Sequence, residues 1–335
     1  MIYPIAGSYF VSFIVVTISI VFVLFLKNNL CNSNLKNIVL LTIAFSLLYF
    51  YNPIWSKDKK DSLEISILQP NINLGLKYDY SQIDLIKKKY LSIISENITN
   101  QTIVFPETAI PLIYEKDKEF YNSVLSLNNS TVITGIFHKK LNQNKIYNSM
   151  LVLNKDEQIY NKRHLVPFGE YIPFKDFFSY IAKRLNIPMS DLSHGDLKQK
   201  AFVVDNIIMH PLICYEIAYP QLINMGNDYS LIINVSNDAW FGDTFAPHQH
   251  LQIARLRALE AAHPVIRAAN TGISAIIDKN GLIIKEIGLN TEGLINSEVY
   301  PSKGISPYMH FGDYPVLMLI FSIMLFYWKR YRRYE

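Results

Sequence analysis

Long uncharged stretches near both ends of the chain constrain its fold more than any other feature of the sequence. Tyr3–Leu26 and Asn37–Ser56 contain no charged side chain. Each is as long as the roughly 20 apolar residues that a helix needs to cross a bilayer. A third uncharged stretch, Tyr314–Trp328, is shorter. We therefore expect two N-terminal transmembrane helices in residues 1–56 and a C-terminal one, followed by a basic tail, in residues 305–335.

Two other interpretations of these stretches are open. The short third stretch also fits a buried core helix. The first stretch could be a signal peptide, but such a peptide has basic residues before the apolar run and small residues at a cleavage site. Neither pattern is found around Tyr3–Leu26, so a membrane helix is the better interpretation there.

Basic residues predict the orientation of these helices. Lys27 and Lys36 flank the loop between the first two stretches, and the tail after Trp328 is rich in lysine and arginine. Cytoplasmic loops carry an excess of such residues, so both segments should be cytoplasmic and residues 57–304 should lie outside. The N-terminus then also lies outside with no earlier helix to carry it there. We therefore expect a shortened form of a protein with more N-terminal helices.

The region between the membrane stretches has the composition of a folded domain. Half of the chain is hydrophobic, 18% is charged and the net charge is only +4. These values exclude a disordered chain and offer no dense basic face for nucleic acid. Short β-branched runs alternate with helical stretches from about Asp61 to Tyr300, which indicates an α/β fold. Asn280-Gly281 is a strong hairpin turn, so part of the sheet should be antiparallel.

The elements predicted from these patterns can be given by their residues. The predicted strands are Leu63–Gln69, Thr102–Phe105, Thr131–Phe137, Ser149–Leu153, Ile159–Lys162, Ala201–Val204, Ile207–Cys214, Leu231–Ser236, Val265–Ala268, Ser274–Ile277 and Ile283–Ile287. The predicted helices are Asp79–Asn97, Lys116–Leu127, Pro220–Met225 and His248–His263.

Three reactive side chains stand at the ends of predicted strands. Glu107 follows a hydrophobic strand and a proline, Lys162 ends a strand, and Cys214 ends another. Each has an ordinary alternative when taken alone: a surface glutamate, a solvated basic loop and a core cysteine. Together they supply what thiol acyl chemistry requires. The carboxylate takes the thiol proton, and the ammonium favours the thiolate and holds the negative oxygen of a tetrahedral intermediate.

The residues around these three positions resemble a known family. The matching motifs are Phe-Pro-Glu-Thr-Ala (105–109), Lys-Arg-His-Leu-Val-Pro-Phe-Gly-Glu-Tyr (162–171), Cys-Tyr-Glu (214–216), Ser-Asn-Asp-Ala-Trp-Phe-Gly (236–242), His250 with Ala-Arg-Leu-Arg-Ala (254–258), and Asn-Thr-Gly-Ile-Ser (270–274). This combination resembles the apolipoprotein N-acyltransferases of the nitrilase, or carbon–nitrogen hydrolase, superfamily. The resemblance extends over about residues 63–300.

The resemblance implies a fold and a reaction. The fold would be a nitrilase-like α-β-β-α sandwich with flanking transmembrane helices, on the periplasmic side of a bacterial inner membrane. Cys214 would take an acyl chain from a phospholipid as a thioester and pass it to the α-amino group of a diacylated lipoprotein. Glu107 would act as base and then acid, and Lys162 as the oxyanion partner. The resemblance implies that neither metal nor organic cofactor is needed. Nothing in the sequence demands more than a monomer, and the small net charge gives no basis for nucleic-acid binding.

Other residues match supporting positions of that family. Glu170 would orient Lys162 or Glu107, and Glu216 would position the nucleophile strand. The substrate-binding residues would be Tyr78, Tyr215, Trp240 and Phe241. Tyr78 stands where the family has tryptophan. Separately, an aromatic run in residues 174–181 is a candidate membrane-dipping arm.

Two rival functions are open at this stage. One is a membrane-tethered amidase of the same superfamily, which the three reactive residues alone do not exclude. The other is a truncated, non-catalytic protein that binds lipid or lipoprotein. The pair His248 and His250 also invites a metal site, but no third ligand has a suitable spacing, so helix-surface or packing histidines are the better interpretation.

Overall fold

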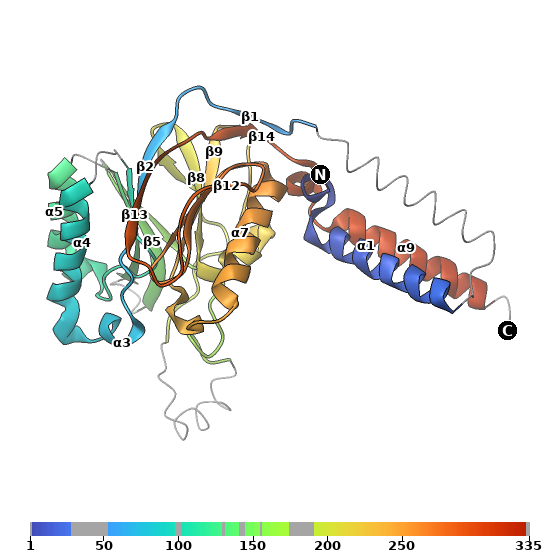
Figure 1. The fold of residues 1–335 in the computed structure, drawn as a ribbon, viewed down its shortest axis with the longest axis horizontal. Helices are drawn as coiled ribbons and strands as arrows, with labels where there is room; N and C mark the ends of the chain where they lie inside the picture. The colour runs from blue at the N-terminus through green and yellow to red at the C-terminus, as the bar shows by residue number, and fades with distance from the viewer. Residues whose placement is uncertain are drawn as a thin grey trace, which may run out of the picture.

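The protein is a two-sheet sandwich with two long helices projecting from one side (Figure 1). The computed structural model describes residues 2–27, 53–97, 102–128, 131–140, 145–154, 156–173 and 191–332. Most of the second predicted transmembrane stretch, residues 37–52, lies outside the described residues, and so does the predicted aromatic arm.

The first sheet has six strands, five from the first half of the domain and one, β13, from near its C-terminal end. In spatial order they are β13 (Gly293–Val299), β2 (Leu63–Gln69), β3 (Thr102–Val104), β4 (Thr131–Lys140), β5 (Lys145–Leu153) and β6 (Glu157–Asn161). The central strands β2, β3 and β4 are parallel, whereas β13, β5 and β6 pair antiparallel with their neighbours. The predicted hairpin of β5 and β6 is therefore confirmed.

The second sheet has eight strands. They are β1 (Ser56–Asp58), β14 (Ser302–Gly304), β9 (Ser230–Ser236), β10 (Val265–Ala269), β11 (Ser274–Ile277) and β12 (Ile283–Ile287), with β8 (Ile207–Ile213) beside β9 and β7 (Phe202–Val204) beside β8. The strands β8, β9 and β10 are parallel. The strands β11 and β12 form the hairpin predicted from Asn280-Gly281, in which Gly281 has a φ of 74°.

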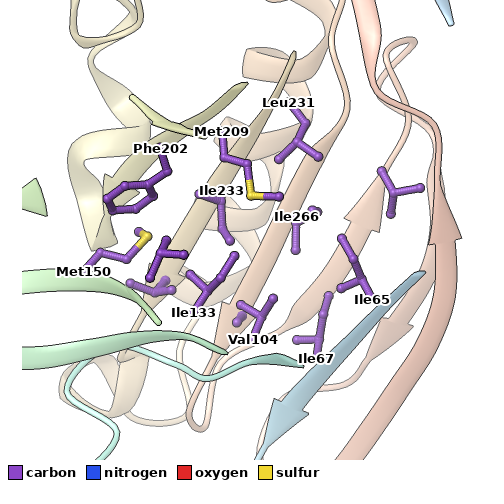
Figure 2. Packing of buried hydrophobic residues seen from close by; sticks show 14 of the residues in the cluster. Ile65, Ile67, Val104, Ile133, Met150, Phe202, Met209, Leu231, Ile233 and Ile266 are labelled. Carbon is purple, nitrogen blue, oxygen red and sulfur yellow. The ribbon is translucent and has the colours of Figure 1, made fainter. Parts of the chain in front are cut away.

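The hydrophobic core lies between the two sheets. Figure 2 shows Ile65, Val104 and Ile133 of the first sheet pointing toward side chains of the second, among them Ile233 and Ile266. The parallel strands are apolar on both faces because each sheet is covered by the other sheet inside and by helices outside. This double burial explains why their sequences are continuous β-branched runs.

Helices cover both outer faces, which completes the expected α-β-β-α arrangement. On the first sheet lie α4 (Ile83–Asn97) and α5 (Lys118–Asn128), and on the second lies α7 (Ala246–Ala261). The helix α4 buries Ile83, Ile86, Tyr90 and Ile94, the spacing of one helical face. Short elements complete the domain: α3 (Leu74–Lys77), η1 (Tyr80–Gln82), η2 (Tyr114–Lys116), η4 (Cys214–Ala218), η5 (Pro220–Leu222), η6 (Asp238–Phe241) and α8 (Pro307–Phe311).

The two projecting helices are α1 (Tyr3–Leu26) and α9 (Tyr314–Tyr331), which lie side by side (Figure 1). Among the described residues one helical segment, Tyr3–Val23, is long and apolar enough to cross a membrane. The helix α9 forms where the C-terminal helix was expected and leaves most of its apolar side chains exposed. That it crosses a membrane stays a prediction.

Two details of the predicted elements were wrong. The segment Pro220–Met225 forms one 3-10 turn over Pro220–Leu222 rather than a helix. The turn-forming residues Gly226, Asn227 and Asp228 follow it, so a second helical turn has no room. Cys214 was expected to end a strand, but it begins the turn η4 with a left-handed φ of 54°.

Candidate active site

The three reactive side chains stand at strand ends of both sheets. Glu107 follows β3, Lys162 follows β6, and Cys214 follows β8. Lys162 Nζ lies 3.4 Å from Glu107 Oε1, and the charges of both groups act on the Cys214 thiol. The structure thus brings the three groups into one site where the two sheets meet, at the carboxyl ends of β3 and β8.

A buried ammonium with two carboxylates forms the centre of this site. Lys162 Nζ lies 2.9 Å from the Glu170 carboxylate as well as 3.4 Å from Glu107. Asn148, on β5, donates from Nδ2 to Oε1 of both glutamates, at 2.7 Å in each case. Burial alone would lower the pKa of Lys162, but Glu107 and Glu170 outweigh it and hold that pKa well above its usual value. Lys162 is therefore a fixed positive charge.

The backbone of Glu107 is fixed by two close contacts. Lys77, almost fully buried at the end of α3, donates from Nζ to the Glu107 carbonyl at 2.9 Å. Burial lowers the pKa of Lys77 to about 8, although the Glu107 charge opposes this. On the other side, a Cβ on Gly135 would lie 2.5 Å from Glu107 Cα, so only glycine allows β4 to approach this closely.

Cys214 is a protonated thiol in the resting site. Its side chain is 9% exposed. Burial, followed by the charge of Glu107, raises the pKa of the Cys214 thiol to about 12, and Lys162 opposes this only in part. Because the thiolate is the nucleophilic form, attack at neutral pH requires a base that takes the proton. Glu107, which lies beside Lys162 and whose charge acts on the Cys214 thiol, is the candidate for this base.

Glu216 ties the cysteine turn to the segment after β6. It is fully buried, and its carboxylate accepts hydrogen bonds from four donors: Ile213 N at 2.9 Å, Tyr160 OH at 3.0 Å, Arg163 N at 2.7 Å and His164 N at 3.0 Å. Burial raises the pKa of Glu216, although these bonds work against it. The carboxylate thereby holds the residues next to both Cys214 and Lys162 in place.

The aromatic residues predicted to bind substrate lie around this centre. Tyr215 is half-buried, donates to the Leu165 carbonyl at 3.0 Å, and has its ring 5.8 Å from Lys162 Nζ. Tyr78, Trp240 and Phe241 are 41%, 62% and 40% exposed. The ring centroids of Tyr78 and Trp240 are 6.3 Å apart, and Glu107, Glu170 and Lys162 act electrostatically on the Tyr78 hydroxyl. They form an exposed aromatic edge beside a buried polar centre.

Several residues of the site were not singled out from the sequence. Asn148 interrupts the apolar run of β5, which was a usable signal, because an amide in a buried strand needs partners. Asn234 interrupts the apolar run of β9 in the same way, and Lys77 begins the Lys-Tyr-Asp stretch (77–79) that stands where the family has Lys-Trp-Asp. His250, which stands among the family motifs, is buried and contacts the Cys214 carbonyl, so of the two interpretations the packing one holds for this residue and the surface one does not. No group of three or more metal-ligating side chains occurs in the part of the chain that the structure describes.

Comparisons with known proteins show which family the chain resembles in sequence. Residues 65–304 match the family model described as carbon-nitrogen hydrolase. The chain is 35% identical to an apolipoprotein N-acyltransferase of Coxiella burnetii, covering 96% of this chain and 67% of that protein. It is 36% identical to one of Photobacterium profundum, covering 77% of this chain and 53% of that protein. The chain thus spans between about half and two thirds of these relatives.

Solved structures show the same fold at low sequence identity. A CN-hydrolase superfamily protein from Xanthomonas campestris, with an arsenic adduct in its active site, superposes with a TM-score of 0.53 at 15% identity, covering 71% of this chain and 91% of that one. Nit3 of Saccharomyces cerevisiae, a member of the nitrilase superfamily, also gives 0.53, at 18% identity, covering 72% of this chain and 90% of that one.

Proposed function

The chain belongs to the carbon–nitrogen hydrolase family, among the apolipoprotein N-acyltransferases, and from this premise we propose that it transfers an acyl chain from a phospholipid to a lipoprotein. The acceptor is the α-amino group of a diacylglyceryl-cysteine at the lipoprotein N-terminus. One observation carries the proposal. A buried lysine–glutamate pair, with Nζ and Oε1 3.4 Å apart, acts on a buried cysteine thiol that has no charge of its own.

In the first step Cys214 becomes acylated. Glu107 takes the thiol proton, and Sγ attacks the carbonyl carbon of a phospholipid ester. Lys162 stabilises the negative oxygen of the tetrahedral intermediate, a role that suits an ammonium held permanently charged by two carboxylates. The carbon–oxygen ester bond breaks, Glu107 returns its proton to the leaving alkoxide, and lysophospholipid departs. The product is a thioester on Cys214.

In the second step the acyl chain leaves as an amide. The neutral α-amino group of the diacylated lipoprotein attacks the thioester carbon, and Glu107 takes a proton from that nitrogen. The carbon–sulfur bond breaks, and the Cys214 thiolate recovers the proton from Glu107. Glu170 and Asn148 act as positioning residues throughout, because they fix Lys162 and Glu107 by the bonds described above.

The surroundings of the site suit lipid substrates in a membrane. The exposed aromatic edge of Tyr78, Trp240 and Phe241 would contact acyl chains. The apolar helix α1 would anchor the domain. We propose a multi-pass protein of the bacterial inner membrane that works as a monomer, with the domain of residues 57–304 on the periplasmic side and the C-terminal helix and tail returning to the cytoplasm.

The proposal is tested by following a labelled acyl chain. The full chain in detergent is incubated with phospholipid that carries a radiolabelled acyl group, and the protein is examined for a hydroxylamine-sensitive adduct. We expect a thioester on Cys214, which Cys214→Ala abolishes. Cys31→Ala, which removes the other cysteine, is the matched control and should keep the label. A diacylated lipopeptide added next should take the label on its amine.

The same experiment separates the rival functions. If label never attaches to the protein but a small amide is hydrolysed, the chain is an amidase of the same family. If lipid binds and neither reaction occurs, it is a non-catalytic binder. Either result would overturn the acyltransferase proposal.

A further inference from the structure

His250 lies directly behind the turn that carries Cys214. It projects from α7, its side chain is buried, and its Nε2 lies 3.2 Å from the Cys214 carbonyl oxygen. A carbonyl can only accept, so Nε2 carries the hydrogen and donates it. Asn234, on β9, donates to the same oxygen from Nδ2 at 3.1 Å. The peptide that follows the cysteine is thus held by two side chains.

The imidazole ring is itself fixed on its other edge. Nδ1 lies 3.0 Å from Asp238 Oδ1 and 3.1 Å from Arg267 Nη2. Arg267 also donates to Asp238 Oδ2 at 2.7 Å, and Ser236 donates to Asp238 Oδ1 at 2.7 Å. Asp238 and Arg267 are fully buried, at the end of β9 and on β10. The ring therefore cannot turn without losing its contacts to Asp238 and Arg267.

This restraint acts on a strained residue. The φ of Cys214 is 54°, a left-handed conformation that a side chain with a Cβ rarely adopts. Such a conformation persists only where the surroundings hold it. Glu216 holds the residue before Cys214, through Ile213 N at 2.9 Å. His250 and Asn234 hold the carbonyl after it. The direction of Sγ follows from these restraints.

We propose that His250 is a positioning residue for the nucleophile: by donating to the Cys214 carbonyl it maintains the left-handed backbone that directs Sγ toward Glu107 and Lys162. The inference rests on the proposed role of Cys214 as nucleophile. This positioning role explains the presence of the Ser-Asn-Asp motif (236–238) and of His250, which no step of the proposed reaction uses. A purely structural histidine would only contribute to folding.

Two substitutions separate these roles. In His250→Gln the side-chain amide reaches as far as Nε2 and can still donate to the Cys214 carbonyl. In His250→Asn the shorter amide reaches only the position of Nδ1 and keeps the Asp238 side of the network alone. Each is made in Cys31→Ser protein, so that Cys214 is the remaining thiol. His248→Asn, two residues away and exposed on the same helix, is the matched control.

The readout is the alkylation rate of Cys214 by iodoacetamide at pH 7, followed by intact mass, with thermal unfolding measured in parallel. A thiol directed at Glu107 can lose its proton there, whereas a misdirected buried thiol cannot. We expect His250→Asn to slow alkylation about tenfold or more, since small misplacements at a reacting centre cost up to about a hundredfold. The alkylation rate of His250→Gln should stay within about threefold of the parent rate. The rate of His248→Asn should equal that of the parent.

The inference is overturned if His250→Asn alkylates at the parent rate, or if His250→Gln is slowed as much as His250→Asn. Should His250→Asn fail to fold, His250→Met takes its place, because methionine has nearly the shape of glutamine and no donor. Cys214 should then be alkylated slowly in His250→Met and at close to the parent rate in His250→Gln. Alkylation needs no acyl donor, so a failure of phospholipid to acylate Cys214 would overturn the proposed function and leave this comparison intact.

Discussion

At the scale of single residues, Glu216 shows how one buried carboxylate organises two segments of the candidate site. Its four donors come from Tyr160, Arg163 and His164 on one side and Ile213 on the other. These residues adjoin Lys162 and Cys214, which are far apart in the sequence. A charged acceptor is suited to this task, because hydrogen bonds to an ionised group are stronger than neutral ones.

We expect Glu216→Gln to destabilise the protein and to slow reaction of Cys214. The amide replaces an accepting oxygen by an N–H group that faces other N–H groups, so buried donors lose their partner. The free energy of unfolding should fall by about 3 kcal/mol, measured by chemical unfolding of the full chain in detergent. The matched control is Glu64→Gln, at the one exposed position of β2, which should change the free energy of unfolding by less than about 0.5 kcal/mol. Equal effects of the two substitutions would contradict the organising role of Glu216.

The sequence predicted the reactive residues of the site better than the residues that hold them. Glu107, Lys162 and Cys214 stand in distinctive motifs with turn-forming neighbours. Asn148 and His250 act through contacts with residues 41 and 36 positions away. Such contacts depend on how the two sheets pack, and local patterns do not encode that packing. A polar residue in an apolar strand or helix face was the available signal.

At the scale of elements, the attachment of α1 to the domain depends on a single glycine. Gly7 has a φ of 71°, and the chain bends there within the helix. A Cβ on Gly7 would lie 2.1 Å from the Tyr308 ring of α8. The bend also frees the amide of Ser8, which donates to Glu260 of α7 at 2.9 Å. The helix α1 thus packs on α7 and α8 through a contact that no larger residue allows.

Gly7→Ala is therefore expected to loosen α1 from the domain. Left-handed backbone costs an alanine about 1–2 kcal/mol, and the ring clash adds to this. Thermal unfolding of the full chain in detergent should show a lower midpoint. Adding Tyr308→Ala removes the clash, so the double variant should lose less than the sum of the single variants. The control is Gly75→Ala, whose nearest neighbour would lie 3.7 Å away. A midpoint for Gly7→Ala no lower than that of Gly75→Ala would disprove the contact.

Most strands were predictable and a few were not, for a physical reason. The strand β9 is buried along its whole length and β2 at every position except Glu64, so their sequences are mostly apolar on both faces. The strand β13 was missed, because Asn296, Ser297 and Glu298 interrupt its pattern. It forms as the partner of β2, pairing along all seven residues. Edge strands take their structure from a neighbour, which the local sequence does not reveal.

At the scale of the whole molecule, burial of histidines links stability to pH. His210, on β8, is 7% exposed, and its Nε2 has no hydrogen-bond partner among the described residues. Burial, followed by the charges of His263 and Arg163, lowers the pKa of His210 from 6.5 to about 4. The folded state therefore binds this proton less readily than the unfolded state. The contribution to stability is complete above pH 6.5 and is lost as the pH falls toward 4.

Replacement of His210 should remove part of the acid sensitivity. Between pH 7 and pH 4 the parent should lose roughly 3 kcal/mol more unfolding free energy than His210→Gln, at about 1.4 kcal/mol for each unit of pKa shift. Chemical unfolding in detergent across this range measures the difference. His248 is exposed, so His248→Gln should lose as much unfolding free energy between pH 7 and pH 4 as the parent does. Parallel curves for the parent and His210→Gln would show that burial of this imidazole is not what makes the fold acid-sensitive.

The contact between α1 and Glu260 has a practical consequence for production of the domain without α1. Glu260 is buried beside Arg257, which ion-pairs with it and donates to the Ile217 carbonyl at 2.9 Å, at the end of the cysteine turn. A shortened chain that begins after α1 would lack the Ser8 amide that donates to Glu260. Arg257, which is held by Glu260, would then hold the cysteine turn less firmly. A water-soluble version of the domain therefore requires a substitution at Glu260 as well as removal of α1.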